Sequence, residues 1–155
     1  MINGKTAALL SACTEVGAIL GGAGNRSRAR YREFGRLLGA AFQVQDDILG
    51  IWGDESATGK SAASDLAEGK LSLPVVYGLR KGGEFAHSWA NASKRRTRAP
   101  ALRKMLEKEG AFEHSVRQAR RLTNQALMQL RTLRPPGRAG AGLAELTRQL
   151  LGRQN

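Results

Sequence analysis

Hydrophobic positions along this chain recur at helical spacing, and no stretch of useful length alternates as a strand would. A nearly apolar segment at residues 5–20 and an amphipathic one at residues 30–51 each predict a helix. Because the first carries almost no charge, we expect most of its faces to be buried. Shorter or more polar helices are predicted at residues 100–110, 112–133 and 143–151.

Glycine, proline and small polar residues mark the breaks between these segments. Residues 53–68 are predicted to form a loop, and Pro74 suits the first turn of a short helix that follows it. A basic, exposed connection is predicted at residues 93–98, and a break at residues 134–142. We expect an all-α fold of antiparallel helices around a central cavity, in a single domain over residues 1–155.

The charge of the chain narrows the choice of partners. The 155 residues hold 25 Lys and Arg against 13 Asp and Glu, a formal net charge of +12. Such a chain favours anionic partners: nucleic acid, an anionic membrane surface or phosphate-bearing small molecules. Residues 46–68 oppose this trend, because their charged side chains are all acidic except Lys60. An acidic cluster inside a basic chain indicates a local function.

Several common classes are disfavoured. With Cys13 as the only cysteine, no intrachain disulfide can form, so a reducing compartment and a cytoplasmic location are expected. No apolar run is long enough for a transmembrane segment, and the N-terminus lacks the layout of a signal peptide. His87 and His114 make no zinc set with one cysteine. A nucleotide P-loop at residues 53–61 is disfavoured, because Asp54 occupies the required glycine position.

Two adjacent carboxylates, Asp46 and Asp47, interrupt the apolar pattern of the second helix. Ionised carboxylates that face a core are costly unless they are paired or bind a metal. Gln43 lies one helical turn before Asp47, so this group could present oxygen ligands to a hard cation such as Mg²⁺. Taken alone, the pair fits a solvated helix surface better than a metal site.

The residues around this pair resemble a known pattern. From Phe42 the chain reads FQVQDDILGIWGDESATGKSAASDLAEGKLSLP, which resembles the second aspartate-rich region of the trans-isoprenyl diphosphate synthases. Lys5-Thr6 resembles that family's upstream Lys-Thr motif. The order and spacing of these pieces fit over residues 4–79, and the later helices match in character. The resemblance implies an isoprenoid-synthase-type helical bundle, of which this chain is the C-terminal half.

The resemblance also implies a reaction. A trans-prenyltransferase uses Mg²⁺ to ionise an allylic diphosphate and condenses the cation with isopentenyl diphosphate, giving geranyl, farnesyl, geranylgeranyl or longer diphosphates. Asp46 and Asp47 would hold the Mg²⁺, and Asp65 would lie in the loop beside Lys60 in a supporting role. Catalytic roles fall on Lys5, Thr6, Gln43 and Lys60. Substrate contacts fall on Lys5, Phe42, Gln43, Lys60 and Lys70.

Two departures from the family pattern change the expectation. Gly50 stands where the pattern has a third Asp, so we expect weaker metal binding rather than loss of function. The family's upstream aspartate-rich motif and isopentenyl diphosphate site have no counterpart in this chain. We therefore expect a fragment, about half a family member, that is inactive in isolation. Complete members commonly pair, so a homodimer is expected for the full-length form.

Two other functions remain open from the sequence. The chain could be a non-catalytic partner subunit of a complete synthase, which the missing half and Gly50 would suit. It could also be a basic helical nucleic-acid-binding protein, which only the charge of +12 favours. Aromatic residues do not interleave with the basic ones as a single-strand binder requires, so no nucleic-acid partner is expected.

Overall fold

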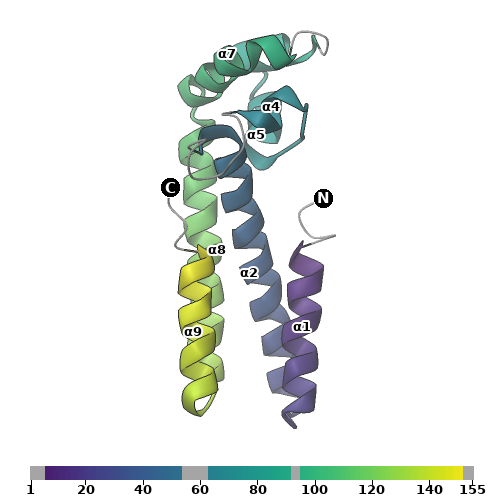
Figure 1. Cartoon of the computed structure of the whole chain (residues 1–155), viewed down its shortest axis with the longest axis vertical. Helices are drawn as coiled ribbons and strands as arrows, with labels where there is room; N and C mark the ends of the chain where they lie inside the picture. The colour runs from purple at the N-terminus through teal and green to yellow at the C-terminus, as the bar shows by residue number, and fades with distance from the viewer. Residues whose placement is uncertain (1–5, 54–62, 92–94, 152–155) are drawn as a thin grey trace. The chain divides into compact units, whose positions relative to one another are not determined.

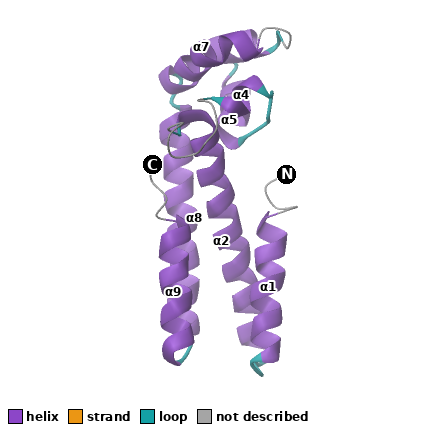
Figure 2. Ribbon diagram, in the orientation of Figure 1, coloured by secondary structure: helices purple, strands orange, loops and turns teal. Residues whose placement is uncertain are grey.

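In the computed structural model, residues 6–53, 63–91 and 95–151 are described, and all their regular structure is helical. Figure 1 traces the chain, and Figure 2 shows helices joined by turns without a strand among these residues. The helices are α1 (Thr6–Leu20), α2 (Asn25–Trp52), α4 (Ser64–Ala67), α5 (Leu73–Lys81), α6 (Glu84–Trp89), α7 (Arg95–Lys108), α8 (Ala111–Leu133) and α9 (Gly137–Leu151). The predicted all-α class is confirmed.

The described residues fall into two compact units, and two helices contribute to both. The first unit holds α1, α2 as far as Gln43, α8 from Gln118, and α9. The second holds the rest of α2 and α8 together with α4, α5, α6 and α7. Each unit has its own apolar core, so each is described by itself.

In the first unit α1 lies along α2 (Figure 1). A Schellman turn ends α1: Gly22 has a φ of 71°, and the Ala23 N–H donates to the Ala18 carbonyl at 2.9 Å. The two helices approach closely because α2 has a glycine at the contact. A Cβ on Gly39 would lie 2.5 Å from the Cα of Ala7, closer than any real side chain tolerates.

Replacing Gly39 with Ala should therefore separate α1 from α2. We expect the free energy of unfolding to fall by about 1–3 kcal/mol, the usual cost of overpacking. Gly17→Ala is the matched control, because a Cβ there meets no atom within 4 Å and alanine is the better helix former. Urea titrations followed by circular dichroism measure both. Equal midpoints for the two variants would contradict the contact.

The prediction that most faces of α1 are buried is wrong. Among the described residues of α1, only Ala7 and Ala18 are buried. Four large side chains on one face stay exposed, by 44% to 83%: Leu9, Val16, Ile19 and Leu20. The contact with α2 uses small residues on one side of α1. A lack of charge does not show whether the other side is covered within the same chain. These four residues are called the apolar face of α1 below.

The cores of the two units are built from different helices. In the first unit, α2 and α8 supply the buried cluster Phe34, Leu37, Leu38, Ala41, Ala126 and Leu130. In the second, the cluster draws on every helix of the unit and comprises Ile51, Ala63, Leu66, Val75, Phe85, Trp89, Ala99, Leu102, Leu106 and Ala111. Burial of Ile51 and Leu66 fixes the end of α2 against α4. This end of α2 carries the predicted acidic pair.

Several predicted boundaries are wrong where the helices are short or polar. α2 begins at Asn25 rather than near residue 30, and α9 begins at Gly137, inside the predicted break. Residues 95–98 belong to α7 rather than to an exposed connection. α4 and α6 lie where no helix was predicted, since six residues or fewer give too little periodicity to detect. Arg, Ser and Thr are also compatible with helix when tertiary contacts favour it.

Candidate functional site

The structure describes six of the eight residues to which the sequence gave a site role. Lys5 and Lys60 lie outside the described residues. The other six lie on α1, on α2 and in the turn between α4 and α5: Thr6, Phe42, Gln43, Asp46, Asp47 and Lys70. They are placed in two groups, one in each unit.

In the first unit the structure brings Thr6 and Gln43 together, although 37 positions separate them in the chain. The Thr6 hydroxyl donates to the Oε1 of Gln43 at 3.2 Å. Gly39, one turn earlier on α2, makes this contact possible, because a Cβ there would also crowd the Thr6 carbonyl at 3.1 Å. Phe42, next to Gln43, is half-buried.

In the second unit the ammonium group of Lys70 lies among three carboxylates. Its Nζ is 2.7 Å from Asp65 Oδ2, 3.3 Å from Asp47 Oδ1 and 3.7 Å from Asp46 Oδ2. Asp47 and Asp65 are almost fully buried, whereas the side chain of Asp46 is 51% exposed. Ionic groups with so little access to water are stable only when they are paired, as these are. The four side chains are called the Lys70 cluster below.

Helix α5 depends on the same cluster. The backbone N–H of Leu73, in the first turn of α5, donates to Asp47 Oδ2 at 2.9 Å. Pro74 follows in the first turn, as predicted, where its missing N–H costs nothing. A carboxylate at a helix N-terminus satisfies an otherwise unpaired N–H and meets the positive end of the helix dipole. Asp47 therefore ties α5 to α2 as well as facing Lys70.

The spacing of Asp65, Gly69 and Lys70 has a local cause. Gly69 takes a φ of 72° at the end of α4, and the chain turns back so that the Lys70 N–H donates to the Asp65 carbonyl at 2.9 Å. The same turn returns the Lys70 side chain to the Asp65 carboxylate. The described end of the predicted loop, residues 63–68, is thus one helical turn with its caps, and the turn that follows directs Lys70 toward α2.

The charge state of Lys70 follows from its surroundings. Burial by itself would lower the pKa of the Lys70 ammonium, but the hydrogen bond to Asp65 and the charges of Asp65 and Asp47 outweigh it. The pKa of Lys70 therefore lies above its ordinary value of 10.5. The side chain stays protonated at neutral pH and is a fixed positive charge in the cluster.

The donor set of the Lys70 cluster suits a magnesium ion. The oxygen atoms that the cluster offers belong to carboxylates, and the carboxylate of Asp46 is open to solvent. Within the described ranges no three acidic, His or Cys side chains converge as a complete metal cage. Mg²⁺ does not need one, because it commonly binds through one or two carboxylates and takes its other ligands from water and phosphate.

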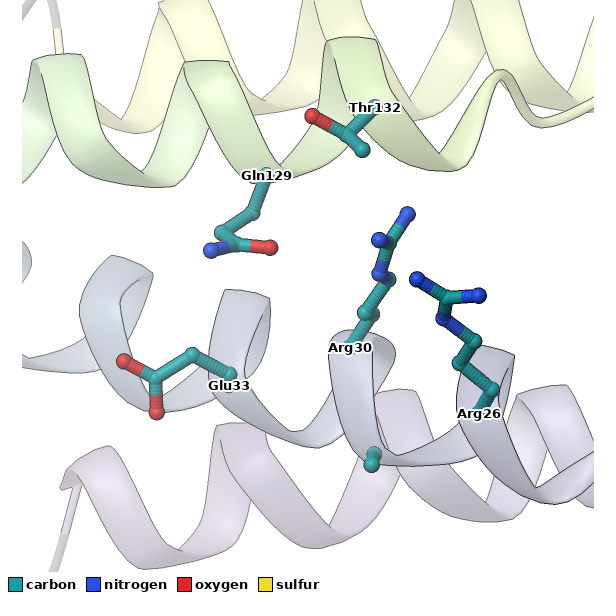
Figure 3. A pocket seen from close by; sticks show the side chains of 6 residues that line it. Arg26, Arg30, Glu33, Gln129 and Thr132 are labelled. Carbon is teal, nitrogen blue, oxygen red and sulfur yellow. The ribbon is translucent and has the colours of Figure 1, made fainter.

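A pocket in the first unit lies away from these residues. It has a volume of about 400 Å³ between α2 and α8. Figure 3 shows Arg26, Arg30 and Glu33 on α2 facing Gln129 and Thr132 on α8. It contains none of the residues predicted for the site. Separately, none of the described helices is both long and apolar enough to span a bilayer.

The sequence analysis identified the role of Asp65 only in part and did not identify the role of Gly50. The sequence gives Asp65 a supporting role beside Lys60, which lies outside the described residues; the structure shows that it bonds Lys70. Gly50 was read only as a missing carboxylate, but its lack of a side chain makes room for Asp65. The Asp-Leu-x-x-Gly-Lys spacing indicates that Asp65 and Lys70 lie close together. No sequence pattern indicates that Gly50 makes room for Asp65.

Curated proteins named as prenyl diphosphate synthases are similar to this chain over half or more of its length. A (2E,6E)-farnesyl diphosphate synthase of Mycobacterium tuberculosis is 35% identical over 162 residues, which is 99% of this chain and 45% of that protein. A geranylgeranyl diphosphate synthase of the same organism is 46% identical over 86 residues, covering 56% of this chain and 25% of that protein. The chain thus spans less than half the length of these relatives.

Solved structures show the same relation. A polyprenyl synthetase from Streptomyces coelicolor superposes with a TM-score of 0.86 at 36% identity, over 94% of this chain and 46% of that one. A heptaprenyl diphosphate synthase from Staphylococcus aureus gives a TM-score of 0.88 at 27% identity, over 99% of this chain and 49% of that one. Residues 1–109 match the family described as polyprenyl synthetase. This chain belongs to the polyprenyl synthetase family.

Proposed function

We propose that this chain supplies the metal- and diphosphate-binding part of a trans-prenyltransferase, which joins an allylic diphosphate to isopentenyl diphosphate. The observation that carries the proposal is the Lys70 cluster, in which a cation and a carboxylate pair on α2 lie within 4 Å of one another. A charge pattern of this kind suits a diphosphate bound through divalent ions. The farnesyl and geranylgeranyl diphosphate synthases among the relatives support the substrate class.

Asp46 and Asp47 would hold Mg²⁺ at the solvent-facing edge of the cluster. When bound, the ion would stabilise the negative charge that develops on a departing diphosphate. Lys70, fixed by Asp65, contributes a permanent positive charge for phosphate oxygens. Contacts from Lys5 and Lys60 to the same diphosphate stay predictions, as do a homodimer and a cytoplasmic location.

Thr6 and Gln43 would act at the reacting carbon rather than at the diphosphate. The hydrogen bond from the Thr6 hydroxyl fixes the orientation of the Gln43 amide. We place this fixed amide dipole and the ring of Phe42 beside the allylic cation. An oriented dipole stabilises the cation without the reorganisation that water would require, and an aromatic face adds cation–π attraction.

The proposed activity is tested by a prenyl-transfer assay with labelled isopentenyl diphosphate and allylic diphosphates of increasing length. The assay compares two preparations: the recombinant 155-residue chain and the native protein purified from its source cells. We expect turnover in the latter, complete loss of it with EDTA, and recovery with Mg²⁺. Turnover that is insensitive to EDTA, or none in either preparation, would refute the proposal.

A non-catalytic partner subunit is the second candidate. Its support is the apolar face of α1; the 46% identity over 82 residues to the large subunit of a heterodimeric geranylgeranyl pyrophosphate synthase from Arabidopsis thaliana bears on pairing with another chain, not on loss of catalysis. Size-exclusion chromatography with and without a full-length synthase separates the two candidates. Co-elution with the synthase, together with no turnover by this protein on its own, favours the partner-subunit role. Separate elution excludes that role.

A further inference from the structure

The pocket between α2 and α8 in the first unit carries two arginines that the proposed function does not use. Arg26 and Arg30 lie one helical turn apart on α2, and both line this pocket of about 400 Å³. Figure 3 shows both guanidinium groups directed from α2 toward α8. Like charges at this spacing destabilise a helix, and an anion bound between them would remove that cost.

Neither arginine is paired. Within the part of the chain that the structure describes, their guanidinium groups form no hydrogen bond and no ion pair. Of the described residues that line the pocket, Glu33 alone is acidic, and both of its carboxylate oxygens accept from Arg36 at 2.7 Å. In Figure 3 the Glu33 carboxylate points away from Arg26 and Arg30. The pocket thus presents two positive charges without a free negative one.

The other groups around the pocket favour an anion in the same place. Gln129 projects from α8 toward α2, and its amide can donate a further hydrogen bond. The Thr132 hydroxyl adds no donor, because it already donates to the Met128 carbonyl at 2.9 Å. Arg26 lies in the first turn of α2, where no acidic side chain offsets the positive end of the helix dipole.

We propose that Arg26 and Arg30 form a second diphosphate-binding site, which needs no metal ion. A guanidinium group binds phosphate oxygens in pairs, and two such groups one turn apart suit two linked phosphoryl groups. The volume of the pocket lies in the usual range for small ligands. Ala29 is the one apolar residue that lines it, so recognition falls on the phosphate head. The inference does not rest on the proposed function, because the charges of the pocket alone set the class of ligand.

The test separates this site from the Lys70 cluster by the need for metal. Inorganic pyrophosphate is titrated into the 155-residue chain by calorimetry in EDTA, at about 0.15 M salt so that diffuse charge attraction is screened. The parent should show saturable binding. The double variant Arg26→Gln with Arg30→Gln should weaken it about 100-fold, about 10-fold for each charged donor. Arg26→Lys with Arg30→Lys keeps the charge but not the paired donors, and its loss should be smaller.

The matched control lies on α8. Arg117 and Arg121 have the same spacing, are both exposed and lie outside this pocket. Arg117→Gln with Arg121→Gln therefore removes the same charge and should leave pyrophosphate binding in EDTA unchanged. Equal losses in the two glutamine double variants would refute the site, because they would show attraction to net charge alone.

A purely structural role for the two arginines is the main alternative. Thr132 lies in the last turn of α8, and the negative end of that helix dipole attracts cations. Under this alternative the parent binds no pyrophosphate in EDTA, and Arg26→Gln with Arg30→Gln lowers the urea midpoint. The proposed site predicts binding by the parent and an unchanged or higher midpoint, because the variant removes a repulsion.

Titration of geranyl diphosphate in EDTA identifies the source of the diphosphate group. An affinity equal to that of inorganic pyrophosphate assigns the site to any diphosphate head, and a higher one assigns it to prenyl diphosphates. Geranyl diphosphate binding that persists in Arg26→Gln with Arg30→Gln would overturn the assignment.

The outcomes for the two sites are independent. Mg²⁺-dependent binding should persist in the arginine variants, since the Lys70 cluster is untouched. A folded parent that binds pyrophosphate only with Mg²⁺ refutes the arginine site and leaves the proposed function intact. A parent that binds equally with Mg²⁺ and in EDTA, through the two arginines, does the reverse.

Discussion

Asp46→Asn is expected to remove most of the Mg²⁺-dependent function while leaving the fold intact. We expect Mg²⁺-dependent pyrophosphate binding, and turnover in the prenyl-transfer assay, to fall about 100-fold, which is typical for losing a group that stabilises developing charge. The side chain of Asp46 is half-exposed, and its ion pair with Lys70 is the longest in the cluster. Such a pair contributes at most about 1 kcal/mol to stability. Titration calorimetry and urea unfolding of the same preparation measure the two effects.

The control for this variant lies on the same helix. Glu33 is also a partly exposed carboxylate on α2 and is ion-paired with Arg36 at 2.7 Å. Glu33→Gln therefore makes the same change in charge at a similar surface position but away from the Lys70 cluster. It should leave Mg²⁺-dependent pyrophosphate binding unchanged. Equal losses in Asp46→Asn and Glu33→Gln would indicate a general charge effect rather than a metal ligand.

Asp47→Ala is expected to be the most destabilising change at the site, by about 3 kcal/mol or more. It leaves the Leu73 N–H without its acceptor, and an unsatisfied buried donor costs about 1–3 kcal/mol. It also removes one partner of a buried ion pair with Lys70. Urea unfolding of Asp47→Ala, compared with Asp46→Ala, isolates the effect of burial, since the same change is made at two adjacent and chemically identical residues.

Asp47→Asn refines this prediction. The amide oxygen of Asn can still accept from Leu73, so α5 should stay attached while the charge is lost. We expect a loss of stability intermediate between the parent and Asp47→Ala, together with a loss of Mg²⁺-dependent binding as large as that of Asp46→Asn. If Asp47→Ala and Asp46→Ala unfold at the same urea concentration, the hydrogen bond to Leu73 contributes nothing measurable.

The sequence predicted the long helices because their patterns repeat over many turns. α8 and most of α2 carry an apolar stripe at helical spacing, which burial in one core produces. α4 and α6 were missed because each is stabilised by contacts distant in sequence. The first turn of α6, for instance, depends on Glu109, whose carboxylate accepts the Phe85 N–H at 2.8 Å. Local patterns hold no record of such partners.

The site shows the same division. Asp46, Asp47 and Lys70 could be named from the resemblance to the family pattern, and the structure places them within one cluster. The second task of Asp47, holding α5, could not be foreseen, since it depends on a backbone group 26 positions away. The meaning of Gly50 also depends on a three-dimensional neighbour, so sequence alone reads it as an absence. A role that depends on which side chain occupies a given volume can be recognised only once the packing of the helices is known.

Association through the apolar face of α1 would make the measured melting temperature of this chain depend on the protein concentration. Leu9, Val16, Ile19 and Leu20 stand in water in the folded chain, and covering apolar surface releases roughly 25 cal/mol for each Å². By mass action, any species that associates with the folded state through this face raises its apparent stability. Melting curves recorded at a single protein concentration would therefore confuse the strength of the fold with the degree of association.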